Sequence, residues 1–156
     1  MLSLTLLAAA LSCTSVTPYQ VLTAPGRYRI SESRYCLELF VDEGAVLSAK
    51  LLPGGKVPTH ARDITAIAWL DDHTLLYSQS AVYGVGGLFQ YDAHRKRETW
   101  LVPSHPPQEA DDLNGYFKLI RVSSSAVEYW FTPDINRIDE SNLEATAERR
   151  TFRREN

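Results

Sequence analysis

Apolar and polar residues alternate in short runs along much of this chain, and small polar turns separate the runs. Alternation with a period of two on both sides of a turn is typical of a β-hairpin, because successive side chains of a strand point to opposite faces. Such pairs of runs occur at residues 35–42 with 45–51, 64–70 with 74–78, 86–92 with 98–102, and 116–122 with 126–131. The pattern predicts four antiparallel hairpins and an all-β fold.

The hairpins recur at a regular spacing. Asp42 and Asp92 end equivalent strands of two hairpins and stand 50 positions apart. Residues 64–102 are expected to form four consecutive strands, and residues 116–153 a second set of the same kind. Self-similarity at this spacing is typical of propellers and repeat arrays, so the sequence predicts antiparallel meander blades.

Two interpretations compete for residues 141–150. Ser141 and Glu144 have the spacing of a helix capping box, which predicts a short helix. Residues 143–152 instead repeat the charge pattern of residues 91–100, which indicates a strand pair. We favour the strand pair and keep the helix as the alternative.

Residues 69–78 and 88–101 resemble the strand pairs of TolB-like and WD-type β-propeller blades. The likeness covers residues 64–102 and, more loosely, 116–153, while residues 27–52 resemble the last part of a blade. A chain of 156 residues is normally one domain and is too short for the four or more blades of a propeller ring. The resemblance therefore implies a partial propeller, an open sandwich-like arrangement of the same meanders, or a homo-oligomer that completes the ring.

The N-terminus has the features of an export signal. Residues 2–11 are almost all apolar, and the run has signal-peptide length, too short for a membrane-spanning helix of about 20 residues. The following Ala10-Leu11-Ser12-Cys13 resembles a bacterial lipobox, which implies lipidation of Cys13 and a place in the bacterial cell envelope, in the outer membrane or the periplasm. The expected divisions are a signal peptide at 1–12, a tether at 13–26 and a β-meander domain at 27–156.

The second cysteine leaves the fate of Cys13 open. If Cys13 carries a lipid, Cys36 lacks an intramolecular partner and is best interpreted as a small buried residue of a strand. A Cys13–Cys36 disulfide is the rival interpretation, and it would exclude lipidation of Cys13. The leader has alternatives as well: an ordinary signal peptide cleaved near Ala10, or an unprocessed apolar first strand.

The charge of the chain restricts its partners. The formal net charge is −3 at pH 7, and no stripe of Lys and Arg alternates with stacking aromatic residues, so nucleic-acid binding is not expected. Four arginines cluster near the C-terminus, and we interpret them as the solvated charges of an edge strand rather than as a partner or phosphate site. They are Arg149, Arg150, Arg153 and Arg154.

Candidate chemistry is confined to turns and loops. His73 and His94 lie in predicted turns with acidic residues, Asp72 among them, and form a metal site or an acid–base cluster only if the fold gathers them. Exposed turn residues are the alternative, which we favour. Asp111 and Asp112 suggest a Ca²⁺ loop, but the calcium-loop spacing is not met, so we favour an Asx-rich turn. No nucleophile elbow or phosphate-binding loop is found, and no catalytic residue or cofactor is assigned.

Aromatic residues offer a second candidate surface. In Tyr129-Trp130-Phe131 the middle ring must lie on the opposite face of the strand from its neighbours. Core packing is the ordinary interpretation. The sharper hypothesis is that Trp130, with Tyr83 and Tyr116, lines a recognition surface for a glycan or a protein partner.

These observations favour an exported, lipid-anchored envelope protein that acts as a non-catalytic binding or scaffolding module. The first alternative is an envelope hydrolase or accessory enzyme subunit, with His73, Asp72 and His94 as its acid–base cluster. A second alternative is an inhibitor or immunity-type lipoprotein that blocks a partner through its aromatic face. The expected partners are the membrane, through the lipid, and an envelope protein or glycan.

Overall fold

The chain folds almost entirely into β-strands. The computed structural model describes residues 12–41, 47–52, 64–80, 86–103 and 115–155. The strands are β1 (Thr14–Val16), β2 (Val21–Leu22), β3 (Gly26–Ile30), β4 (Cys36–Phe40), β5 (Ser48–Leu52), β6 (Ile64–Trp69), β7 (Thr74–Gln79), β8 (Gly87–Asp92), β9 (Arg97–Pro103), β10 (Tyr116–Val122), β11 (Ala126–Thr132) and β12 (Glu148–Arg153). Two short helical elements, η1 (Ile135–Arg137) and α1 (Leu143–Thr146), lie between β11 and β12. The predicted all-β fold is confirmed.

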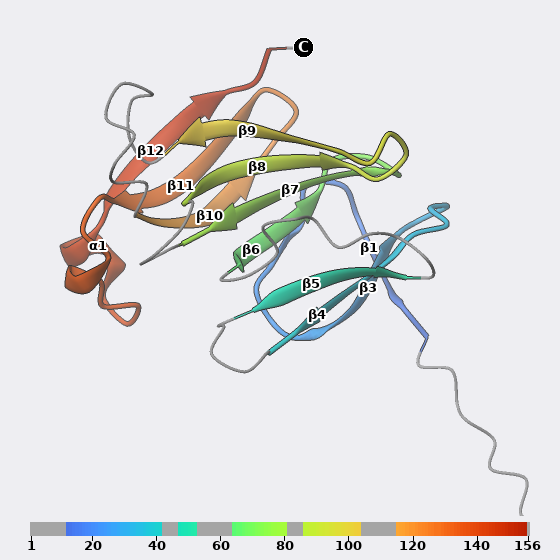
Figure 1. Cartoon of the computed structure of the whole chain (residues 1–156), viewed down its shortest axis with the longest axis horizontal. Coiled ribbons are helices and arrows are strands. Elements are labelled where there is room, and N and C mark those ends of the chain that lie inside the picture. The colour runs from blue at the N-terminus through green and yellow to red at the C-terminus, as the bar shows by residue number, and fades with distance from the viewer. Residues whose placement is uncertain (1–11, 42–46, 53–63, 81–85, 104–114, 156) are drawn as a thin grey trace, which may run out of the picture.

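The strands form three sheets that lie on one another as layers (Figure 1). The first sheet has the order β1-β3-β4-β5, the central sheet the order β2-β6-β7-β8-β9, and the third sheet the order β10-β11-β12. Neighbouring strands run antiparallel except β1 and β3, which run parallel. Within the described residues the sheets stay open and none closes into a barrel.

The four predicted hairpins are confirmed as β4–β5, β6–β7, β8–β9 and β10–β11. Residues 64–102 also form the expected run of four strands, since β6 to β9 pair in chain order. The expected second run of four strands is wrong. In residues 116–153 the structure has only the three strands β10 to β12.

The segment before β12 contains the short helix of the alternative interpretation of residues 141–150, but not its capping box and not the strand pair that we favour. One helical turn, α1, comes first, and a single strand rather than a strand pair follows and pairs with β11. The capping box does not form, because the Ser141 hydroxyl donates to Asp139 Oδ1 at 2.6 Å and Asn142 takes the N-cap position. The preference for a strand pair is therefore wrong, although the strand that matches the β8–β9 charge pattern does exist.

Strands β6 and β7 of the central sheet are buried on both of their faces. Every residue of β6 and β7 is buried, and neither strand holds a charged residue. One apolar core lies between the first and central sheets and includes Leu37, Trp69 and Tyr77. The other lies between the central and third sheets and includes Leu76 and Phe117. Two-sided burial explains why these two strands lack the alternation of apolar and charged residues that one-sided strands show.

Side-chain size is matched across the second core. The face of β6 toward the third sheet carries Ala66 and Ala68, both fully buried. Opposite them the third sheet supplies large rings: the Phe117 ring centroid lies 4.9 Å from that of Phe131 and 5.8 Å from that of Tyr129. Small residues on one layer leave the space that the rings on the other layer fill, as close packing requires.

Three buried hydroxyls join the central sheet to the edge of the third sheet. The Leu119 N–H donates to Ser78 Oγ at 3.1 Å, and Ser78 Oγ lies 2.7 Å from Thr65 Oγ1. Thr65 donates in turn to the Phe117 carbonyl. Ser80 Oγ accepts from the Phe117 N–H at 3.0 Å. These side chains satisfy main-chain groups of β10 that would otherwise be buried without a partner.

The outward faces of the two outer sheets carry charged pairs. On the first sheet the Arg27 side chain donates to Glu38 at 2.8 Å across β3 and β4. On the third sheet Glu128 accepts from both Arg121 and Arg149. These pairs cross neighbouring strands on surfaces that water reaches, so both ends of the stack are polar layers.

Residues 13–26 are part of the folded domain and not a tether. β1 pairs with β3, and β2 pairs with β6 at the edge of the central sheet. Val16 and Leu22 reach the first core, where they are 5% and 6% exposed. Burial of these apolar side chains is the physical reason why the segment follows the sheets instead of extending into solvent.

The expected signal peptide falls largely on residues 1–11, which lie outside the described residues. Among the residues that the structure does describe, no helix combines the length and the apolar character that crossing a membrane would require.

We predict that Ser78→Ala lowers the free energy of unfolding by about 1–3 kcal/mol, because it leaves the buried Leu119 N–H without an acceptor. Urea unfolding followed by fluorescence measures the change.

Ser48→Ala is the matched control. Ser48 is also buried, but its hydroxyl has no hydrogen-bond partner within the described residues, so its removal should leave the stability unchanged or raise it. Equal losses in the two variants would show that the hydroxyl contacts to β10 do not stabilise the fold.

Candidate functional site

Three turns that are distant in sequence meet at one end of the first and central sheets. The Ser33 hydroxyl, between β3 and β4, donates to the Asp72 carbonyl at 2.6 Å, between β6 and β7. The Ala93 N–H, between β8 and β9, donates to the His73 carbonyl at 2.8 Å. The Tyr35 hydroxyl donates to the Ala93 carbonyl at 3.3 Å. We call this region the turn end, made of residues 33–35, 71–73 and 92–95.

Two of the three turns are built in the same way. Asp71 Oδ1 accepts from the backbone N–H groups of His73 and Thr74, at 3.0 and 2.7 Å. Asp92 Oδ1 accepts from the N–H groups of the residues two and three positions later, His94 and Arg95, both at 2.9 Å. Each is an Asx turn, in which the aspartate side chain replaces a backbone acceptor.

This shared geometry brings the two histidines together. Each stands two residues after its turn aspartate, and the hairpins that carry them are neighbours in the central sheet. The imidazole centroids of His73 and His94 lie 6.1 Å apart with the rings at 64°. The fold therefore places His73, His94 and Asp72 at the turn end, but the group whose ligand atoms lie within 4.8 Å of one another is Asp71, Asp72 and His73, without His94.

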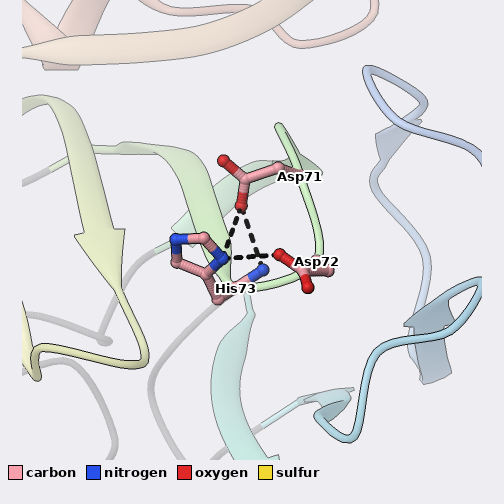
Figure 2. A group of neighbouring side chains, drawn as sticks. All are labelled: Asp71, Asp72 and His73. Carbon is pink, nitrogen blue, oxygen red and sulfur yellow. Dashed lines mark hydrogen bonds and ion pairs between the residues drawn. The ribbon is translucent and has the colours of Figure 1, made fainter.

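His73 has an acidic environment. Its Nδ1 lies 2.5 Å from Asp72 Oδ1 and 3.3 Å from Asp71 Oδ1, and Figure 2 shows both carboxylates on the same side of the ring. The hydrogen bond that Asp72 accepts from the ring raises the pKa of His73. Slight desolvation opposes this increase, and the charges of Asp71, Asp72 and Asp92 add to it. The His73 side chain is 41% exposed, so the ring is in contact with water as well as with these acidic groups.

The environment of His94 is different, because a cation lies beside it. Arg34 Nη2 is 3.5 Å from His94 Nδ1 and donates to the Tyr35 hydroxyl at 2.8 Å. The Arg34 guanidinium also lies 5.0 Å from the Tyr35 ring centroid. Desolvation alone would raise the pKa of Asp92, yet the Arg95 and His94 amides, with the charge of His73, lower it on balance.

The turn end combines donor types that bind cations. The ligand atoms of Asp71, Asp72 and His73 all lie within 4.8 Å of one another. Imidazole nitrogens and carboxylate oxygens are ligands of divalent transition metals, and a histidine oriented by a carboxylate is also the arrangement of a general base. The geometry suits either cation binding or proton transfer. The exposure of these side chains to water distinguishes the two roles.

Three other predicted site residues lie outside the described residues: Tyr83, Asp111 and Asp112. The structure therefore gives no geometry for the proposed calcium loop or for the Tyr83 part of the aromatic surface.

The remaining members of the aromatic surface do not form an exposed patch. Tyr116 is 2% exposed, and its hydroxyl donates to Glu140 at 3.1 Å, so the expectation that its ring is open to a partner is wrong. Trp130 is half-buried and lies on the outward face of the third sheet, opposite Lys118 and Arg149 on the neighbouring strands. The segment before β12 supplies Glu140, and its contacts with Tyr116 help to bury that ring.

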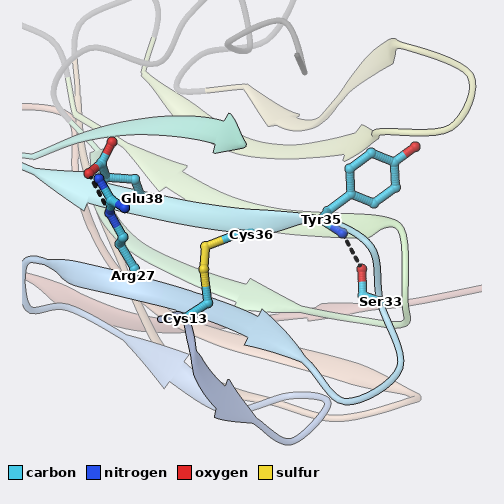
Figure 3. Close-up of a disulfide and its surroundings, with 6 residues drawn as sticks. All are labelled: Cys13, Arg27, Ser33, Tyr35, Cys36 and Glu38. Carbon is cyan, nitrogen blue, oxygen red and sulfur yellow. Dashed lines mark hydrogen bonds and ion pairs between the residues drawn. A yellow bond between two sulfur atoms is a disulfide. The ribbon is translucent and has the colours of Figure 1, made fainter. Parts of the chain in front are cut away.

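Cys13 and Cys36 are joined by a disulfide, the alternative that the sequence left open (Figure 3). The bond fixes the residue before β1 to the first residue of β4, with the Cα atoms 6.2 Å apart. A sulfur in a disulfide has no thiol to carry a lipid, so the structure disagrees with lipidation of Cys13.

Sequence reasoning missed several residues of potential importance. Arg34 and Tyr35 line the turn end, but they stand about 40 and 60 positions from the histidines and carry no motif. Trp100 is 39% exposed and stacks on Phe89, with the rings 5.8 Å apart and nearly parallel. Its place among the charged residues of an outer strand was a signal that its ring would be partly open to water.

Comparisons with known proteins add no relative to these observations. No protein-family model matches the chain, and no curated protein or solved structure gives a significant match.

We predict that His73 titrates above the ordinary histidine pKa of about 6.5 in the folded protein, and that Asp72→Asn lowers its pKa. Because the folded-state pKa is the raised one, the stabilisation is complete below the unfolded-state pKa and is lost as the pH rises through the folded-state pKa. NMR titration of the ring protons measures both effects. A His73 pKa that does not respond to Asp72→Asn would show that the hydrogen bond has no influence on the titration.

Proposed function

We propose that the chain is an exported binding module of the bacterial cell envelope, stabilised by the Cys13–Cys36 disulfide, and that the turn end is its recognition site. The observation that carries the binding role is the convergence of three sequence-distant turns, which places exposed His73, His94 and Arg34 on a rigid base of sheets. Binding residues are commonly found on loops that a scaffold positions in this way.

The disulfide supports export. Structural disulfides persist in oxidising compartments and are rare in the cytoplasm, where thiols are kept reduced. The apolar run of residues 2–11 has the length of a signal-peptide core and ends just before Cys13. The predicted leader and the disulfide both support an oxidising compartment outside the cytoplasm, and they do so independently of each other.

We favour the Cys13–Cys36 disulfide over a lipid anchor on Cys13. The same sulfur of Cys13 would have to form either a bond to Cys36 or a thioether to a lipid. The β1–β3 pairing and the burial of Val16 also hold the following residues on the domain, where a tether would need freedom. Attachment to the membrane through a lipid on Cys13 is therefore the competing outcome, and mass spectrometry of the mature N-terminus tests it.

An enzymatic role is the second candidate, and one observation favours it. The Asp72–His73 hydrogen bond has the form of a base held by an orienting carboxylate. Catalysis by such a pair gains most in a water-excluded pocket, where charges interact strongly. Because His73 is 41% exposed and Asp72 67% exposed, water screens these charges, and the exposure favours binding over catalysis.

The compartment can be tested by the thiol state of the full chain produced with its own N-terminus in a Gram-negative host. We expect the protein in the periplasmic fraction, with Cys13 and Cys36 alkylated only after reduction. Mass spectrometry of the mature N-terminus provides the check on the lipid. Two free thiols in the cytoplasm would contradict export. A lipid on Cys13 would contradict the disulfide and show that the chain is anchored to a membrane.

We further predict that the double variant Cys13→Ser/Cys36→Ser loses roughly 3 kcal/mol of unfolding free energy, the expected effect of a bridge across 23 residues. Urea unfolding with and without reductant measures the loss. The native chain should respond to the reductant and the double variant should not. An unchanged native stability after complete reduction would show that the bond does not hold the N-terminal strand in place.

A further inference from the structure

We propose that His73 and His94 together bind one divalent transition-metal ion at the turn end. The proposal rests on the proposed role of this region as a recognition site, and it names the ligand class. The two imidazoles come from different hairpins, so the site exists only in the folded chain.

His73 is held in the orientation that a metal ligand needs. Its Nδ1 lies against Asp72 Oδ1, which assigns the proton to Nδ1 and leaves the lone pair on Nε2. Figure 2 shows Nε2 on the opposite side of the ring, directed away from both aspartates. A carboxylate that accepts from one imidazole nitrogen while the other binds the metal is a recurrent arrangement, because it fixes the ring and increases its basicity.

His94 presents the second imidazole at a fitting separation. A ligating nitrogen lies about 2 Å from the metal, so two ring centroids can stand about 6 Å apart across one ion. The separation of the His73 and His94 centroids is 6.1 Å. His94 is not part of the Asp71–Asp72–His73 group whose ligand atoms lie within 4.8 Å of one another, so the imidazoles have to rotate toward each other to share an ion.

The Arg34 guanidinium is a cation that already lies beside His94 at the turn end. Its guanidinium lies 3.5 Å from His94 Nδ1, on the lone pair that a metal could use. Arg34 is exposed and belongs to a different turn, so it can move away without disturbing the hairpin that carries His94. The guanidinium therefore competes with the metal, and its removal is expected to strengthen metal binding.

The carboxylates around the histidines favour a cation and help to select its type. Asp71, Asp72 and Asp92 surround the His73 ring with negative charge, while Asp71 and Asp92 remain engaged as turn acceptors. Two imidazoles suit Zn²⁺, Ni²⁺ or Cu²⁺, whereas Mg²⁺ and Ca²⁺ prefer sites made of oxygen ligands alone. Water would complete the coordination of an ion bound at this surface.

Calorimetric titration of the oxidised full chain with Zn²⁺ and with Ni²⁺ tests the proposal. We expect one ion per chain, and binding weakened about tenfold or more by either His73→Ala or His94→Ala. The double variant His73→Ala/His94→Ala should lose less binding free energy than the sum of the two single losses, because both rings serve one ion. Circular dichroism shows whether each variant keeps the strands.

Four further measurements separate a built site from chance binding. Arg34→Gln should bind Zn²⁺ more tightly than the native chain, and Asp72→Asn more weakly. The double variant His60→Ala/His105→Ala removes the two histidines outside the described residues and should leave the affinity unchanged. Mg²⁺ should give no competition at the same concentrations.

The outcomes against the proposal are distinct from those against the proposed function. Native affinity in both His73→Ala and His94→Ala, or no binding of either ion, would overturn the metal site. In that case a periplasmic, disulfide-bonded protein would still support the exported module. Free cytoplasmic thiols would instead overturn export, whatever the titration gives.

Discussion

Burial of β6 and β7, two strands of the central sheet, on both faces is the constraint on which the rest of the structure depends. A sheet covered from two sides has no face left for charged residues, and β6 and β7 carry none. The outer sheets each meet only one neighbour, so they place apolar residues inward and charged pairs outward. The main-chain groups at the edge of β10 face protein rather than water, and hydroxyls of Thr65, Ser78 and Ser80 satisfy them.

The same constraint determines where function can lie. With both faces of β6 and β7 covered, the accessible parts of the central sheet are its edge strand β9 and the turns, and the turns at one end meet a turn of the first sheet. The N-terminal strand β1 is held on the first sheet by its pairing with β3 and by the disulfide that joins the residue before it to β4. Sheets supply rigidity, and the turn end supplies the exposed imidazole, guanidinium and carboxylate groups.

Local sequence patterns predicted the hairpins well, because alternation and turn residues are properties of neighbouring positions. They missed β1 and β2, since strands of three and two residues are too short to show a period and depend on partners elsewhere in the chain. At residues 141–150 two local patterns disagreed, and the Ser141–Asp139 contact decided against the capping box. Each histidine and its turn aspartate were visible in the sequence, but their meeting with Arg34 was not, because it follows from how the sheets stack.

The Asx turns separate the residues that shape the turn end from those that give it chemical character. Asp71 and Asp92 hold the turns through their side chains, whereas His73 and His94 contribute their backbone N–H groups to the same turns. Side chains at positions 73 and 94 can thus be exchanged for others while the hairpins keep their form. The fold provides a platform whose specificity could be rewritten by substitution, with the aspartates as the two positions that must stay.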